Sequence, residues 1–211
     1  MKLKILYVTI RRRKWPLINR YFLFLFVLLF TVPAYSITID NVKFDEQLKI
    51  SEKVTIPLRN AQKYAPFRFS IYAVALYVDG NETDNMKLKD ADVPMALQLV
   101  SLSRLLRLNT LISELRRGFS YGMDHDKEFL ETIQDRIEAF VYIFERKNRS
   151  PKRYEKMVFS YEPGAGTHIH FEERYLGTIP GHDFKRALFG IWLNNNCAND
   201  QLRDDIIKIR K

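Results

Sequence analysis

The chain has 211 residues and a formal net charge of +9, with 34 lysines and arginines against 25 aspartates and glutamates. Seven of the basic residues and none of the acidic ones lie in residues 1–36, which leaves a nearly neutral body of 27 bases and 25 acids. This balance argues against a nucleic-acid-binding domain, because such domains concentrate positive charge. A hydrophobic content of 46% excludes a disordered chain. The single cysteine, Cys197, excludes an intrachain disulfide and a cysteine-based zinc site.

The first 36 residues have the pattern of a secretory signal peptide. A basic leader is followed by twelve uncharged residues, 21–32, and small residues then stand at Ala34 and Ser36, where signal peptidase reads the chain. Twelve helical residues span about 18 Å, which is short of the roughly 30 Å hydrocarbon core of a bilayer. We therefore expect an exported, periplasmic protein whose mature domain is residues 37–211. An inner-membrane anchor through residues 17–32 is the alternative.

The mature region begins with strand-like segments. Residues 37–39 and Phe44 predict a first strand with a turn, and a second extended segment starts at residues 54–56. Residues 67–78 alternate in a way that leaves both faces largely apolar, which is typical of a central strand covered on both sides. Residues 96–102 predict a further strand.

The pattern then changes to helical spacing. One apolar stripe runs from Leu108 to Leu115, and we expect this helix to end at Gly118. A second stripe of apolar residues runs from Phe129 to Phe144 and predicts a second helix.

The C-terminal part returns to strands before it ends in helices. Residues 157–161 and 167–171 flank a glycine-containing turn and predict a hairpin, and residues 175–179 predict a third short strand. We expect one helix capped by Asp183 and a last helix from about Asn199. Strands, then helices, then a meander and more helices are typical of an α+β domain, with a mostly antiparallel sheet covered by a layer of helices.

Two segments near the C-terminus carry a family resemblance. Residues 161–167 read YEPGAGT, and residues 176–193 read LGTIPGHDFKRALFGIWL. This block resembles the C-terminal signature of bacterial chalcone isomerase-like proteins, and the segments 71–78 and 115–119 resemble further parts of the same family. The resemblance covers nearly all of residues 37–205. It implies an open-faced β-sandwich with an apolar cleft between the sheet and the helices.

The resemblance does not extend to the catalytic groups of the true isomerases. Those enzymes hold a negative oxygen with an arginine and with neighbouring hydroxyl and amine groups, and they use no cofactor. In the register of the family, the corresponding positions here are Tyr64, Tyr72, Arg107, Thr110 and Glu114. None of them keeps the residue type of the enzymes, so we assign no catalytic residue and expect no ring-closing activity. A cofactor-independent intramolecular lyase with Arg68 or Arg104 as its oxyanion anchor is the alternative.

Non-catalytic members of the wider family bind fatty acids, with an arginine and a tyrosine meeting the carboxylate. The resemblance therefore implies a small hydrophobic or fatty-acid-like ligand, and Arg68, Tyr72 and Arg104 are the candidates for the polar end of the cleft. The simpler interpretation of these residues is two surface arginines and a core tyrosine. A third hypothesis is a structural or partner-binding protein of the cell envelope with a closed cleft.

Two other groups of residues have the chemistry of a binding site. His168 and His170 share one face of a predicted strand, but a zinc site needs further ligands, so we predict the wet face of a hairpin and no metal. Arg104, Arg107, Arg116 and Arg117 form a basic face in the helix region. A solvated surface is the simplest interpretation of that face, and peripheral contact with a membrane is the alternative.

Overall fold

The computed structural model describes residues 36–104, 106–197 and 199–210. The predicted signal peptide, residues 1–36, lies outside the described residues except for Ser36, and the alternative membrane anchor, residues 17–32, lies wholly outside them. Within the described ranges, no helix has both the length and the apolar composition needed to cross a bilayer.

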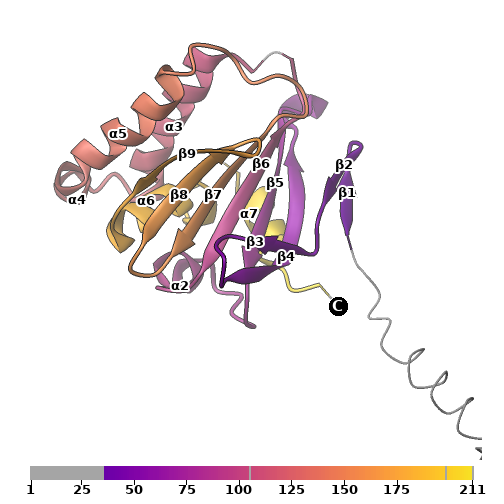
Figure 1. The fold of residues 1–211 in the computed structure, drawn as a ribbon, viewed down its shortest axis with the longest axis horizontal. Helices are drawn as coiled ribbons and strands as arrows, with labels where there is room; N and C mark the ends of the chain where they lie inside the picture. The colour runs from indigo at the N-terminus through magenta and orange to yellow at the C-terminus, as the bar shows by residue number, and fades with distance from the viewer. Residues whose placement is uncertain (1–35, 105, 198, 211) are drawn as a thin grey trace, which may run out of the picture. The chain divides into compact units, whose positions relative to one another are not determined.

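Seven strands form one antiparallel sheet whose order in space follows their order in the chain (Figure 1). They are β3 (Gln47–Lys49), β4 (Thr55–Tyr64), β5 (Tyr72–Val78), β6 (Met95–Ser101), β7 (Lys156–Glu162), β8 (Gly166–Phe171) and β9 (Arg174–Ile179). Two further strands, β1 (Ile37–Ile39) and β2 (Val42–Phe44), form a separate antiparallel hairpin.

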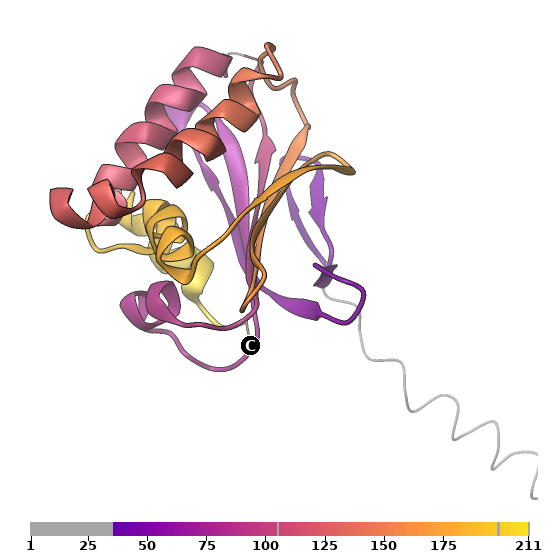
Figure 2. The same cartoon turned by 60° about the vertical axis from the view of Figure 1, so that its left-hand side comes forward.

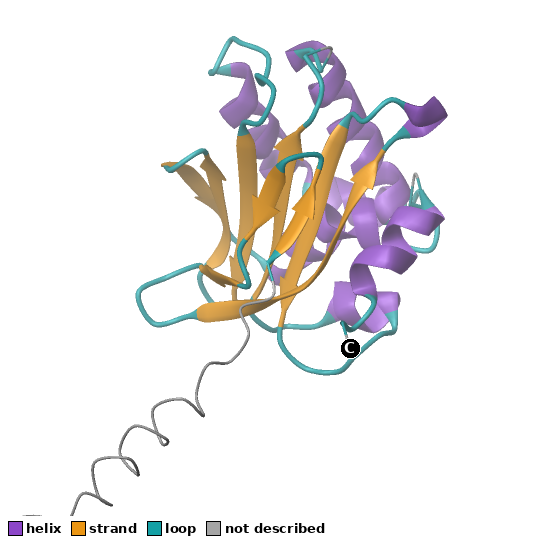
Figure 3. Cartoon of the chain, turned by 90° about the vertical axis from the view of Figure 1, so that its right-hand side faces the viewer, coloured by secondary structure: helices purple, strands orange, loops and turns teal. Residues whose placement is uncertain are grey.

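The helices gather on one face of the sheet, as Figure 2 and Figure 3 show from two sides. They are α2 (Asn85–Asp90), α3 (Leu108–Gly122), α4 (Lys127–Thr132), α5 (Gln134–Glu145), α6 (His182–Leu193) and α7 (Asp200–Ile207). The β1–β2 hairpin lies on the other side of the sheet in Figure 2. This arrangement confirms the predicted α+β class and the open-faced sandwich.

The central strand β5 separates two hydrophobic cores. Val74, Leu76 and Val78 point into the large core under the helices, whereas Ala73 and Tyr77 point into a smaller core. The smaller core also contains Phe44 of the β1–β2 hairpin, which is fully buried. Both faces of β5 are therefore covered, as the alternation in its sequence predicts.

The prediction of a strand from residue 67 was wrong, because β5 begins only at Tyr72. Residues 66–68 form a 3₁₀ turn, and the amide of Ile71 donates to the Tyr64 carbonyl to close the β4–β5 hairpin. The alternation of Phe67 and Phe69 thus belongs to a loop.

The extended segment at residues 54–56 is the start of the ten-residue strand β4, which tolerates Pro57 beside the short edge strand β3.

The helix boundaries differ from the sequence expectations in four places. Helix α3 continues through Gly118 to Gly122, and the second apolar stripe is divided between α4 and α5 at Ile133. Helix α2 was missed; it begins after Asp84, whose carboxylate accepts from two amides of the first turn. Gly181, and not Asp183, occupies the N-cap position of α6.

Glycines allow α3 and α6 to approach closely. A Cβ added at Gly118 would lie 2.8 Å from Cγ2 of Ile191, and one added at Gly122 would lie 2.8 Å from the backbone of Gly190 and Ile191. These distances are shorter than van der Waals contact, so the two backbones can meet only where side chains are absent.

A buried lysine joins α6 to the end of α2. Lys185 has no exposed surface, and its ammonium donates to the carbonyls of Leu88, Lys89 and Ala91 at 2.7–3.3 Å. These carbonyls lie at the C-terminal end of α2, where a helix has few backbone donors of its own; the Leu88 carbonyl also accepts from the amide of Ala91. Burial lowers the pKa of Lys185 to about 7.

Candidate functional site

A cavity of about 380 Å³ lies between the helix-covered face of the sheet and helices α3 and α6. Its inner walls are mainly apolar: Leu99, Leu111, Leu115, Met157, Phe159 and Ile191. The volume and the apolar lining are those of a small-molecule site, which typically measures about 300–1,000 Å³. The structure therefore offers a small ligand a place inside the large core.

Helix α3 presents two neighbouring rows of side chains to this cavity. Leu111, Leu115 and Gly118 form the inner row and are buried. Thr110, Glu114, Arg117 and Tyr121 follow at the same helical spacing, line the cavity as well, and are exposed to solvent. This second row, called here the polar rim, marks the side on which the cavity opens.

The polar rim carries one paired charge of each sign. Arg117 donates a hydrogen bond to Glu114 three residues earlier on α3, and both side chains are more than half exposed. The two charges cancel at the mouth of the cavity. A ligand carboxylate that approaches Arg117 must therefore compete with Glu114.

Two tyrosines stand opposite the rim, on the sheet. Tyr64 and Tyr72 are direct partners in the β4–β5 ladder, and their ring centroids are 5.2 Å apart. The Tyr72 hydroxyl accepts a hydrogen bond of 3.2 Å from the indole nitrogen of Trp192 on α6. Burial raises the pKa of Tyr72, so this side chain remains a neutral phenol that can still donate its own proton.

The comparisons with known proteins agree with this arrangement. A model of the chalcone isomerase-like family matches residues 36–207. The chain belongs to this family. A comparison with curated proteins gave no match.

Among solved structures, the chain is similar to the fatty-acid binding protein AtFAP1 of Arabidopsis thaliana. The TM-score is 0.61 at 14% sequence identity, and the match covers 82% of this chain and 96% of that chain. At this identity the likeness shows the shared chalcone isomerase-like fold.

The family register places four of its five positions at the cavity. Tyr64, Tyr72, Thr110 and Glu114 line it, whereas Arg107 does not and is exposed. The fold thus brings together four of the five positions that the resemblance assigns to the catalytic groups of the isomerases, with other side chains in them.

The three residues predicted to hold the polar end of a ligand are separated in the structure. Tyr72 lines the cavity. Arg68 lies in the β4–β5 loop and Arg104 in the loop after β6; both are exposed, and neither is among the residues that line the cavity. Arg117 is the arginine that does line it, although its sequence pattern predicts only a place on a basic face. Its position seven residues after Thr110 and three after Glu114 is the signal that could have identified it.

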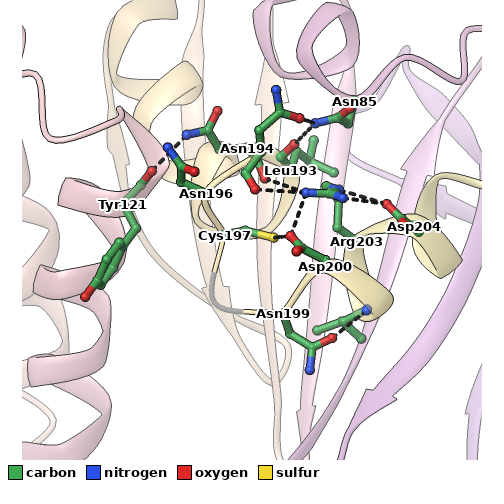
Figure 4. A network of polar contacts seen from close by, with 12 residues as sticks. Asn85, Tyr121, Leu193, Asn194, Asn196, Cys197, Asn199, Asp200, Arg203 and Asp204 are labelled. Carbon is green, nitrogen blue, oxygen red and sulfur yellow. Dashed lines mark hydrogen bonds and ion pairs between the residues drawn. The ribbon is translucent and has the colours of Figure 1, made fainter.

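The remaining candidates lie outside the cavity. Nδ1 of His168 and the hydroxyl of Thr178 share a hydrogen bond of 2.6 Å, and the described residues contain no group of three or more potential metal ligands. Cys197 lies beside Asp200 in a polar network that ties the end of α6 to α7 (Figure 4). In that network Arg203 donates to the carbonyl of Asn195 and to Asp200, and burial raises the pKa of Cys197, which disfavours the reactive thiolate.

Proposed function

We propose that this chalcone isomerase-like protein binds an amphipathic small molecule of the fatty-acid class, without transforming it. The observation that carries the proposal is the apolar cavity of about 380 Å³ with a polar rim along one side. The fatty-acid binding function of AtFAP1, a protein of the same fold, supports it. We further propose that the protein belongs to the bacterial, exported branch of the family, which the signal-peptide pattern of its N-terminus supports.

The lining suggests how such a ligand would be oriented. An acyl chain would lie against Leu99, Met157 and Phe159, where each buried methylene gains about 0.8 kcal/mol from leaving water. The polar group would then point toward the rim, within reach of Tyr72 or Arg117. We propose Tyr72 as the direct contact among the three predicted residues, because it alone of them lines the cavity.

The polar groups of the lining favour binding over ring-closing chemistry. The true isomerases of this fold are expected to stabilise the negative oxygen with a preorganised arginine and neighbouring donors. Among the described lining residues the cation is Arg117, which is exposed and paired with Glu114. The raised pKa of Tyr72 also makes it a poor general base at neutral pH.

The test is ligand binding by the purified full chain. Native mass spectrometry should detect a co-purified lipid, and competition with a fluorescent fatty acid should give a saturable affinity. Thr110→Trp should block the mouth and weaken that affinity at least about tenfold, since a bulky ring would occupy the rim. Asn109→Trp, which changes an exposed neighbour outside the lining, is the matched control.

Two results would contradict the proposal. Equal affinities of the two tryptophan variants would place the ligand elsewhere on the protein. Turnover of a chalcone by the wild-type chain, lost in Arg68→Ala or Arg104→Ala, would instead establish the lyase alternative.

A further inference from the structure

Two phenylalanines project into solvent at the tip of the β4–β5 loop. Phe67 is 93% exposed and Phe69 is 70% exposed, the highest exposures among the large hydrophobic residues of the described chain. Arg68, between them, is also exposed. We call residues 66–69 the aromatic tip. Leaving two such rings in water is unfavourable, and adjacent exposed apolar side chains commonly mark an interaction site.

The aromatic tip is held in a defined shape. Asp40, in the β1–β2 turn, accepts hydrogen bonds from Lys63 before the tip at 2.9 Å and from Ser70 after it at 2.7 Å. Phe67 and Arg68 have φ angles of 51° and 69°, a region that costs side-chain-bearing residues free energy. The loop therefore keeps both rings outward at the expense of backbone strain.

Arginines lie on the aromatic tip and on the loop beside its base. The amide of Leu102 donates to the carbonyl of Ile71 at 2.9 Å, so the loop after β6 lies beside the base of the tip. That loop carries Arg104 and Arg107, and neither they nor Arg68 has an ion-pair partner among the described residues. Arg116 and Arg117 differ, because Glu138 and Glu114 neutralise them.

The aromatic tip also adjoins the mouth of the cavity. Tyr64 lies two residues before the tip and Ile71 two residues after it, and both line the cavity. Leu106, in the loop that carries Arg104 and Arg107, lines it as well. Figure 1 shows both loops at the upper end of the sheet, beside the start of α3. A surface that contacted the tip would therefore face the opening of the ligand site.

We propose that the aromatic tip docks on an anionic lipid bilayer and brings the cavity mouth to the membrane surface. Phe67 and Phe69 enter the interfacial region, while Arg68, Arg104 and Arg107 face the lipid phosphates. A bilayer suits this site better than a protein partner, because two rings on a short loop fall well short of the roughly 800 Å² that each partner buries in a stable protein interface. That the cavity mouth takes up its ligand at the membrane rests on the proposed function; the docking does not.

The test follows the environment of the tip in the full chain. An NBD fluorophore is attached at Phe67→Cys, and separately at Val93→Cys, in a Cys197→Ser background. Val93 is exposed near the start of β6, at the other end of that strand from the cavity. Addition of phosphatidylglycerol vesicles should raise and blue-shift the emission at position 67 and leave position 93 unchanged. Equal responses at the two positions, or none at position 67, would overturn the proposal, even if another segment of the chain binds the vesicles.

Variants then separate the two parts of the docking surface. Phe67→Ser with Phe69→Ser should lower the vesicle partition coefficient at least about tenfold, and Val93→Ser should not change it. Replacing Arg68, Arg104 and Arg107 by glutamine should lower it about 100-fold on anionic vesicles at low salt and little on phosphatidylcholine vesicles. Partitioning unaffected by these replacements would refute the assignment.

A solution assay distinguishes failure of docking from failure of ligand binding. Neither Phe67 nor Phe69 lines the cavity, so their double serine variant should keep the wild-type affinity for a fluorescent fatty acid without vesicles. Fatty-acid binding without vesicle docking would refute only this inference. Docking without fatty-acid binding would refute only the proposed function.

Discussion

The indole nitrogen of Trp192 donates a hydrogen bond to the hydroxyl of Tyr72, and this contact joins α6 to the central strand at the cavity wall. The same two side chains, with Tyr64 and Ile191, also bound a void of about 20 Å³ that Cys197 and Leu202 close on its other side. The pair therefore separates the ligand site from the polar network at the start of α7.

Tyr72→Phe should weaken fatty-acid binding about threefold to tenfold, because the ligand loses a hydrogen-bond donor and Trp192 loses its acceptor. Titration with a fluorescent fatty acid measures the change. Tyr77→Phe is the matched control, since Tyr77 lies on the same strand but points into the smaller core. If both variants bind equally well, the Tyr72 hydroxyl does not contact the ligand.

Glu114→Gln should raise the affinity for a fatty acid about twofold to fivefold, because Arg117 is then released from its ion pair. The affinity for the corresponding fatty alcohol should not change, and the gain should shrink at high salt. Competition binding with the two ligands measures both effects. Weaker binding of the acid alone would show that Glu114 itself contributes to the site.

Lys185→Met should lower the free energy of unfolding by about 2–4 kcal/mol, because the carbonyls of Lys89 and Ala91 lose the ammonium donor inside the core and that of Leu88 keeps only the long contact from Ala91. Urea denaturation measures the loss. Lys87→Met, which changes a side chain that is 70% exposed on the same helix, should stay within about 0.5 kcal/mol of wild type. A wild-type stability for Lys185→Met would mean that water or a shifted backbone satisfies those carbonyls.

Gly122→Ala should destabilise the protein by about 1–3 kcal/mol, since the new Cβ would meet the backbone of α6 at 2.8 Å. The sign of this stability change is informative, because the same substitution within an ordinary helix would stabilise the protein by about 1 kcal/mol. Thermal or urea unfolding gives the sign, and Ser113→Ala on the exposed side of α3 serves as control. A stabilised Gly122→Ala variant would contradict the close contact of the two helices.

The Arg136–Asp183 ion pair should make stability depend on acid pH. Both guanidinium nitrogens of Arg136 bind the carboxylate at 2.6 and 2.7 Å, which holds the pKa of Asp183 below its usual 3.8. The contribution is therefore complete above about pH 4–5 and disappears as the pH falls through the lowered value. Unfolding curves of wild type and Arg136→Gln should differ at neutral pH and converge in acid. A difference that is constant down to pH 2 would exclude the linkage.

Much of the fold could be predicted from local sequence patterns. The two apolar faces of β5, the hairpin at Gly164 and Gly166, and the packing face of α6 each follow from residues close together in the chain. The errors also have local causes. Phe67 and Phe69 continue the alternation of β5 beyond its hydrogen bonds, and the six-residue helix α2 is too short to show a period.

The cavity could be predicted only in part. The family register led to Tyr72 and Glu114, but it gave no means of choosing among the arginines. The rotation of α3 about its own axis decides which of its polar residues face the opening. The contact of Gly122 with α6 fixes this rotation, and α6 lies almost seventy residues further along the chain. Arg68 is near Tyr72 in sequence, and Arg104 follows Ser101, the partner of Tyr72 across the sheet. Both arginines nevertheless lie in loops and are exposed to solvent.

Helices α3, α4 and α5 belong to a single segment of the chain between two strands of the sheet. The three helices are inserted between β6 and β7, which are themselves paired neighbours from Met95–Tyr161 to Val100–Lys156. The α3 wall of the cavity, unlike its α6 wall, therefore belongs to one segment that departs from and returns to adjacent strands. Residues on the α3 wall can change, and with them the shape of the cavity, while the pairing of β6 with β7 stays as it is.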